Sequence, residues 1–126
     1  SNVKLTKEGL SLQIKYNSTI YNLKSPMLGD YMAENITACF ALAHNIGLDP
    51  AKIIESIAKF TGIKRRLEKK YDNRITVFDD IAHSPDKVKS ALESLRSIYK
   101  NKIFVIFEPT LVIVMSNLYQ VIKMLL

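Results

Sequence analysis

The sequence predicts an α/β fold in which antiparallel strands and a pair of helices precede a strand, a helix and a second strand. Residues 3–23 alternate apolar and polar side chains, which is the pattern of half-buried antiparallel strands. Residues 31–60 carry apolar side chains at the spacing of two helices. Residues 74–107 change from strand to helix and back to strand character, which predicts a βαβ unit.

The alternating segment is expected to form a small meander of strands. Leu10, Leu12 and Ile14 share one face of its main strand, and polar residues lie between them. Turns are expected at residues 7–9 and 17–18, where residues that favour turns interrupt the alternation.

Two short helices are expected to follow the sheet. The first runs from residue 31 or 32 to residue 46, with Gly47 as its left-handed C-terminal cap. Its apolar residues recur at intervals of three and four: Ile36, Cys39, Phe40, Ala43 and Ile46. Asp49 and Pro50 begin the second helix, because aspartate is a favourable N-cap and proline fits the first helical position. The apolar stripe of the second helix consists of Ile53, Ile54, Ile57 and Phe60.

The second half of the chain is expected to contain a parallel βαβ unit. Residues 74–78 are rich in side chains that favour strands. Ser84 and Pro85 then begin a helix, as cap and first residue, and its apolar stripe extends to Tyr99. Residues 103–107 are an unbroken apolar run, as expected for a strand covered on both faces. A right-handed crossover would make the two strands parallel, with ligands bound beyond their carboxyl ends.

Charge and cysteine content limit the classes of function. The chain of 126 residues has a net charge of +6, but its basic residues are scattered among acidic ones except at residues 64–66 and 69–70. So short a cluster suits phosphate better than a nucleic acid, although a role in solubility alone stays open. The single cysteine, Cys39, excludes an internal disulfide and is predicted to be a small buried side chain. No signal sequence and no long apolar run is visible, so a cytoplasmic protein is expected.

Polar chemistry gathers within residues 62–97. Asp80 follows a predicted strand, where a carboxylate can accept hydrogen bonds from ribose hydroxyls or can bond only the loop backbone. Arg66 is a candidate phosphate ligand, because guanidinium combines charge with a planar set of donors. His83 lies just before the helix and either shapes a pocket or is structural.

Two motifs of this segment resemble those of the Mur ligase family, the ATP-dependent amide-forming enzymes of peptidoglycan synthesis. They are Gly-Ile-Lys-Arg-Arg-Leu-Glu at residues 62–68 and Asp-Asp-Ile-Ala-His-Ser-Pro-Asp-Lys at residues 79–87. The Lys-Arg-Arg run resembles the branch acting on UDP-N-acetylmuramate, which contains an L-alanine-adding ligase and a recycling ligase for a murein tripeptide. The second motif favours the recycling type. The resemblance covers about residues 25–109.

The resemblance implies that residues 1–62 are the C-terminal part of a central ATPase domain. Residues 63–126 would then begin a Rossmann-like C-terminal ligase domain. ATP with Mg²⁺ would activate a carboxylate as an acyl phosphate, which an amine attacks. The partners implied are UDP-N-acetylmuramate and an amino acid or peptide, with no nucleic acid and no membrane. By position, the nucleotide would contact four residues: Asn35 near the adenine, Arg66 at the domain hinge, Asp80 at the ribose, and His83.

The chain also departs from the family pattern. Tyr31 and Met32 replace a His-Asn pair or its equivalent, and no Gly-x-x-Gly-Lys-Ser/Thr loop for the triphosphate and magnesium occurs. The chain is therefore predicted to be a fragment that is inactive alone. A folylpolyglutamate-synthase-like ligase and a non-catalytic nucleotide-binding module are the alternatives. From about Thr110 the apolar sequence replaces an expected polar loop, which suggests a frameshifted tail or, alternatively, an amphipathic helix.

Overall fold

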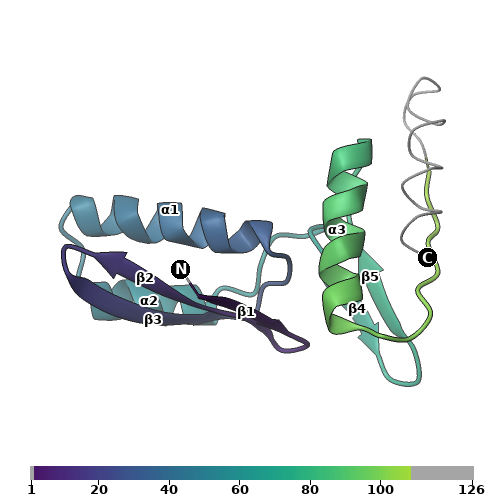
Figure 1. Cartoon of the computed structure of the whole chain (residues 1–126), viewed down its shortest axis with the longest axis horizontal. Coiled ribbons are helices and arrows are strands. Elements are labelled where there is room, and N and C mark those ends of the chain that lie inside the picture. The colour runs from purple at the N-terminus through teal and green to yellow at the C-terminus, as the bar shows by residue number, and fades with distance from the viewer. Residues whose placement is uncertain (1, 109–126) are drawn as a thin grey trace. The chain divides into compact units, whose positions relative to one another are not determined.

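The computed structural model describes residues 2–108 of the chain. It contains two compact units, Ser1–Gly62 and Ile63–Leu126, each of which is described by itself (Figure 1). The frameshift hypothesis concerns residues outside the described range. No helix among residues 2–108 is both long enough and apolar enough to cross a membrane.

The first unit contains a three-stranded antiparallel meander, as predicted. Its strands β1 (Val3–Thr6), β2 (Gly9–Tyr16) and β3 (Thr19–Ser25) lie side by side in chain order (Figure 1). Asn17 and Ser18 join β2 to β3 with φ angles of 45° and 65°. Two positive φ angles are typical of a type I′ turn, whose twist matches that of the strands it connects.

Two helices complete the first unit, α1 (Tyr31–Asn45) and α2 (Pro50–Lys59). The side chain of Asp49 accepts a hydrogen bond of 3.0 Å from the N–H of Ala51, so the predicted N-cap is confirmed. Gly47 follows α1 with a φ of 88°, in the left-handed conformation expected there. Helix α1 packs on β2, and α2 packs on β3 and α1.

The core of the first unit lies between the apolar face of the sheet and one face of α1. Phe40 is fully buried at its centre. The other buried residues of this core are Leu10, Leu12, Ile14, Leu23, Met32, Ala33, Ile36 and Ile53. The prediction for Cys39 was wrong, because this side chain is exposed. The apolar residues of α1 lie on two faces of the helix. Only the face with Ile36 and Phe40 is buried in the core, and Cys39 lies outside it.

The second unit begins with an antiparallel hairpin of β4 (Glu68–Asp72) and β5 (Thr76–Asp79). Strand β5 lies close to the predicted strand, whereas β4 was not predicted because its side chains are charged and mostly exposed. Helix α3 (Pro85–Ile98) follows, with Pro85 as its first residue. Ser84 occupies the N-cap position, but its side chain makes no capping hydrogen bond.

Residues 103–107 depart from the prediction of a parallel strand covered on both faces. Within residues 2–108, this segment belongs to no strand, and β5 pairs with β4 alone. Ile103, Val105 and Phe107 pack against α3, while the alternate residues Phe104 and Ile106 are 87% and 102% exposed. Apolar composition indicates which segment suits burial in a sheet, but a strand also needs a neighbour that pairs with its backbone. The α/β class and the order of the other predicted elements are confirmed.

Candidate functional site

The basic motif forms an irregular turn at residues 64–67, near the start of the second unit. Arg65 and Leu67 have positive φ angles of 58° and 43°. Left-handed backbone of this kind costs ~1–3 kcal/mol for each residue with a side chain, so surrounding contacts must hold it. The side chain of Leu67 supplies one such contact, because it is buried with 4% of its surface exposed.

Asp80 joins this turn to the segment before α3 through hydrogen bonds of its side chain. Its Oδ2 accepts a hydrogen bond of 2.8 Å from the N–H of Leu67, and its Oδ1 accepts one of 2.7 Å from the N–H of Ala82. The N–H of Ile81 donates to the carbonyl oxygen of Arg65 over 2.9 Å. Each carboxylate oxygen has a further lone pair. Asp80 therefore bonds the loop backbone and keeps acceptor capacity for hydroxyl groups, so its ribose role stays a prediction.

Glu68 holds the same turn from the other side. Its Oε2 accepts a hydrogen bond of 2.8 Å from the N–H of Arg65, and the ammonium of Lys70 lies 2.7 Å from its Oε1. Lys70 first, and then the Arg65 N–H, lower the pKa of the Glu68 carboxyl. Glu68 was not among the candidate site residues predicted from the sequence. The spacing alone carried no signal, because a capping box needs Ser or Thr at the first position and a helix after it, whereas Arg65 and strand β4 stand there.

The cations of the motif differ in their surroundings. The Nε of Arg65 lies 3.7 Å from Oδ2 of Asp79, in a pair that is largely exposed. Arg66 is half-buried, and within the described part of the chain no carboxylate forms an ion pair with it. The phosphate-binding role of Arg66 stays a prediction.

His83 lies on the same loop as Asp80. The ring is exposed, and its Nδ1 lies 3.1 Å from the carbonyl oxygen of Ile81. A carbonyl only accepts, so Nδ1 carries the proton in this contact. The hydrogen bonds of Asp80 thus join the turn that contains Arg66 to the loop that contains His83.

Asn35 belongs to the first unit and not to this turn. It is exposed on α1, and its Nδ2 lies 3.7 Å from the sulfur of Met32. This contact does not bear on the predicted role of Asn35 at the adenine, which stays a prediction. Among residues 2–108, no group of three or more His, Cys, Asp and Glu side chains is arranged to hold a metal ion.

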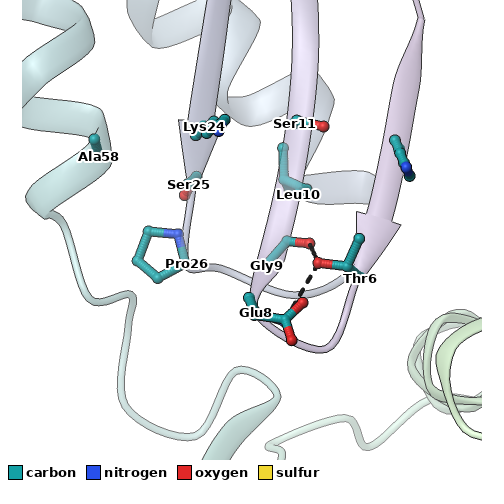
Figure 2. A pocket seen from close by; sticks show the side chains of 10 residues that line it. Thr6, Glu8, Gly9, Leu10, Ser11, Lys24, Ser25, Pro26 and Ala58 are labelled. Carbon is teal, nitrogen blue, oxygen red and sulfur yellow. Dashed lines mark hydrogen bonds between the residues drawn. The ribbon is translucent and has the colours of Figure 1, made fainter.

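An open groove of about 390 Å³ lies elsewhere in the first unit, by the turn between β1 and β2 (Figure 2). The hydroxyl of Thr6 donates to the carbonyl oxygen of Gly9 over 3.2 Å and accepts from the N–H of Glu8 over 3.3 Å. A Cβ atom on Gly9 would lie 2.0 Å from the carbonyl oxygen of Ser25, so glycine allows these strands to approach. None of the four candidate residues lines this groove.

The family model that matches this chain is the Mur ligase, glutamate ligase domain, over residues 65–122. The chain belongs to the Mur ligase family. The matched range contains Arg66, Asp80 and His83. It also includes most of the segment that the frameshift hypothesis concerns. The family resemblance predicted from the two motifs is confirmed.

Curated relatives of this Mur ligase chain are named UDP-N-acetylmuramate–L-alanine ligase. The protein of Brachyspira hyodysenteriae is 41% identical over 85 residues, which are 67% of this chain and 18% of the relative. That of Pelagibacter ubique is 36% identical over 116 residues, which are 86% of this chain and 25% of the relative. The chain thus spans about a fifth of the length of the relatives it matches.

Solved structures show the same family likeness. The UDP-N-acetylmuramate–alanine ligase MurC of Thermotoga maritima has a TM-score of 0.85 and 27% identity, over 97% of this chain and 29% of that one. A murein peptide ligase of Psychrobacter arcticus has a TM-score of 0.51 and 29% identity, over 75% of this chain and 21% of that one. A complex of FPGS with AMPPCP and folate has a TM-score of 0.69 over 81% of this chain and 26% of that one, but at 24% identity it shows the fold alone.

Proposed function

We propose that this chain is part of an ATP-dependent UDP-N-acetylmuramate–L-alanine ligase and forms the hinge side of its ATP site. The observation that carries the proposal is the fastened turn, in which Asp80 bonds the backbone next to Arg66. Residues 1–62 would be the end of the central ATPase domain and residues 63–126 the start of the ligase domain. The division of the chain after Gly62 supports this assignment.

The proposed roles follow from the chemistry of each side chain. Asp80, already oriented by two backbone donors, accepts hydrogen bonds from the ribose hydroxyls. Arg66 donates to phosphate oxygens, and its uncompensated charge favours them. His83 offers Nε2 to the nucleotide, and Asn35 is the adenine contact that the family resemblance implies. Bound ATP supplies the phosphoryl group that activates the carboxylate of UDP-N-acetylmuramate.

Magnesium and the triphosphate need groups that this chain does not provide. The sequence contains no P-loop, and no cluster of metal ligands occurs among residues 2–108. The residues present therefore suit the ribose and one phosphate contact, but not the metal. We place the P-loop and the metal ligands in another part of a longer protein, and the 126-residue chain alone is expected to be inactive.

The names of the relatives favour L-alanine over the recycled tripeptide. The Brachyspira and Pelagibacter relatives are both L-alanine ligases, and the likeness to the Thermotoga structure is closer than that to the murein peptide ligase. These comparisons favour the L-alanine ligase over the recycling type that the second motif had suggested. The Lys-Arg-Arg run also argues against a folylpolyglutamate-synthase-like enzyme.

The test of the proposal uses the complete reading frame that contains this chain. The frame should encode a P-loop upstream, and its product should form UDP-N-acetylmuramoyl-L-alanine with consumption of ATP. Replacing Asp80→Ala should raise KM for ATP by about tenfold or more, because a hydrogen-bonded charged acceptor is lost, and should leave KM for L-alanine nearly unchanged. A product without ligase activity, or an unchanged KM for ATP, would contradict the proposal.

A second test separates a fragment from an independent binding module. The 126-residue chain is titrated with ATP and with UDP-N-acetylmuramate in separate calorimetric experiments. A fragment should bind both weakly, because most of each site lies outside the chain. Tight and specific binding of either ligand would instead support the non-catalytic module.

A further inference from the structure

Arg66 lies between two residues whose backbone is left-handed. Arg65 has a φ of 58° and Leu67 a φ of 43°, which side chains with a Cβ atom rarely adopt. The direction of the Arg66 side chain depends on the backbone on both sides of it. The contacts that fix Arg65 and Leu67 therefore also fix the direction in which Arg66 points.

Two carboxylates hold these two backbone positions, one on each side of Arg66. Glu68 accepts the N–H of Arg65, and Asp80 accepts the N–H of Leu67, each over 2.8 Å. The ammonium of Lys70 lies 2.7 Å from the second oxygen of Glu68 and so orients that carboxylate. Glu68 thus has a bond to each of its two oxygens within the hairpin and its turn.

We propose that Glu68 is a positioning residue for the nucleotide, which holds the Arg65 backbone so that Arg66 points at the phosphates. The inference rests on the proposed function, since it takes Arg66 as a phosphate ligand. The oxygens of Glu68 accept from the Arg65 N–H and from Lys70, and a carboxylate repels the phosphates of a nucleotide. Its effect on ATP must therefore pass through Arg66.

A double-mutant cycle in the complete ligase tests this dependence. Arg66→Ala should weaken ATP binding by about tenfold to a hundredfold, the loss expected for a hydrogen bond to a charged group. Glu68→Ala should weaken it by about threefold to tenfold, the loss expected for one ordinary hydrogen bond. In the Arg66→Ala background, Glu68→Ala should cause no further loss. An equal loss from Glu68→Ala in both backgrounds, or no loss in either, would overturn the inference.

Conservative and control variants separate positioning from general stability. Glu68→Gln keeps an oxygen that can accept the Arg65 N–H and should retain most of the ATP affinity. Glu55→Ala removes the carboxylate of another exposed ion pair, with Lys59 on α2, and should leave ATP affinity unchanged. A Glu68→Gln variant as weak as Glu68→Ala would also overturn the inference, because the backbone hydrogen bond would then not be the cause.

The two proposals fail in different ways. If Arg66→Ala leaves ATP affinity unchanged, the nucleotide role of the turn is wrong. If Arg66→Ala weakens ATP but the effect of Glu68→Ala is additive, only the positioning role is wrong. Amide hydrogen exchange in the 126-residue chain gives a readout without ATP: Glu68→Ala should speed exchange at Arg65, with the Ala51 N–H as an unaffected reference. An unchanged exchange rate at the Arg65 N–H would show that Glu68 does not hold this part of the backbone, and would overturn the inference.

Discussion

Individual residues in the turn at 64–67 combine an unfavourable backbone with favourable contacts. Leu67 is left-handed and also buried, so its apolar side chain helps to keep the backbone in place. Arg66 and Asp80 were predicted as functional candidates from the sequence, because Arg66 lies in a short basic run and Asp80 directly follows a predicted strand. Bonding of the loop backbone by Asp80 was one of two alternatives that the sequence left open. The N–H of Leu67 as its donor, and the bond from the Arg65 N–H to Glu68, were not predicted, since these depend on φ angles that the residue types at 65 and 67 disfavour.

Replacing Leu67→Ala should destabilise the second unit. The expected loss is ~2–5 kcal/mol of unfolding free energy, because a buried leucine side chain is removed. Urea unfolding followed by circular dichroism measures it. Ile75→Ala, at a side chain that is 65% exposed, is the matched control and should cost less than about 1 kcal/mol. Equal losses would show that burial of Leu67 does not hold the turn.

Glu68 should titrate below its ordinary value of 4.5, because Lys70 and the Arg65 N–H favour the carboxylate. The bonds of Glu68 then stabilise the folded chain fully above pH 4.5, and this contribution is lost as the pH falls through the lowered pKa. Lys70→Ala removes the largest cause and should raise the pKa. NMR titration of the side-chain carboxyl carbon compares the two proteins. An unchanged pKa would mean that Lys70 does not pair with Glu68 in solution.

Among the elements, α1 shows most clearly what a sequence pattern leaves open. Its apolar residues occur on two faces, and spacing alone cannot tell which face meets the sheet. The structure buries Ile36 and Phe40, while Leu42 and Ile46 are 67% and 69% exposed. Helix ends were predicted more closely, because capping residues such as Asp49 and Gly47 act through local contacts. Strand β4 was missed since its charged residues give no apolar alternation.

The two faces of α1 should respond differently to truncation. Phe40→Ala should lower the free energy of unfolding by ~3–5 kcal/mol, because the aromatic ring fills the centre of the core. Leu42→Ala on the opposite side should cost less than about 1 kcal/mol. Chemical denaturation of the two variants provides the comparison. A larger loss of stability from Leu42→Ala would mean that the face of α1 with Leu42, and not the face with Phe40, lies in the core.

Cys39 offers an independent check of the same helix. Because its side chain is exposed, it should react with a thiol reagent under native conditions about as fast as in denaturant. Reaction can be followed by the absorbance of the released thiolate. A much slower reaction of Cys39 in the folded chain would mean that the side chain is buried, as the sequence predicted.

At the scale of the whole molecule, the contacts between residues divide the chain into two compact units after Gly62. The assignment of residues 1–62 to a central ATPase domain and of residues 63–126 to a ligase domain stays a prediction. Pairing between segments was harder to predict, as residues 103–107 show: their apolar sequence suited a buried strand, yet Phe104 and Ile106 are exposed. The residue types of a segment determine its propensity to form a strand, but a strand also requires a second segment that pairs with its backbone.

The exposed residues of this segment should promote self-association. Replacing both Phe104→Ser and Ile106→Ser removes two apolar side chains from the surface and should shift sedimentation toward the monomer at high concentration. The matched variant Val105→Ser alters a residue that packs on α3 and should instead lower stability. Unchanged association in the double variant would mean that these side chains are not the contacts responsible.

The meander of the first unit also has a consequence for folding kinetics. Strands β1, β2 and β3 pair only with neighbours in the chain, and the tight turn at Asn17 and Ser18 keeps the second pairing short. Such low contact order means that little loop-closure entropy is lost before native contacts form. A β-hairpin forms within about 1–10 microseconds. The three strands therefore have time to pair before the ribosome, which adds roughly 5–20 residues per second, has synthesised the second unit.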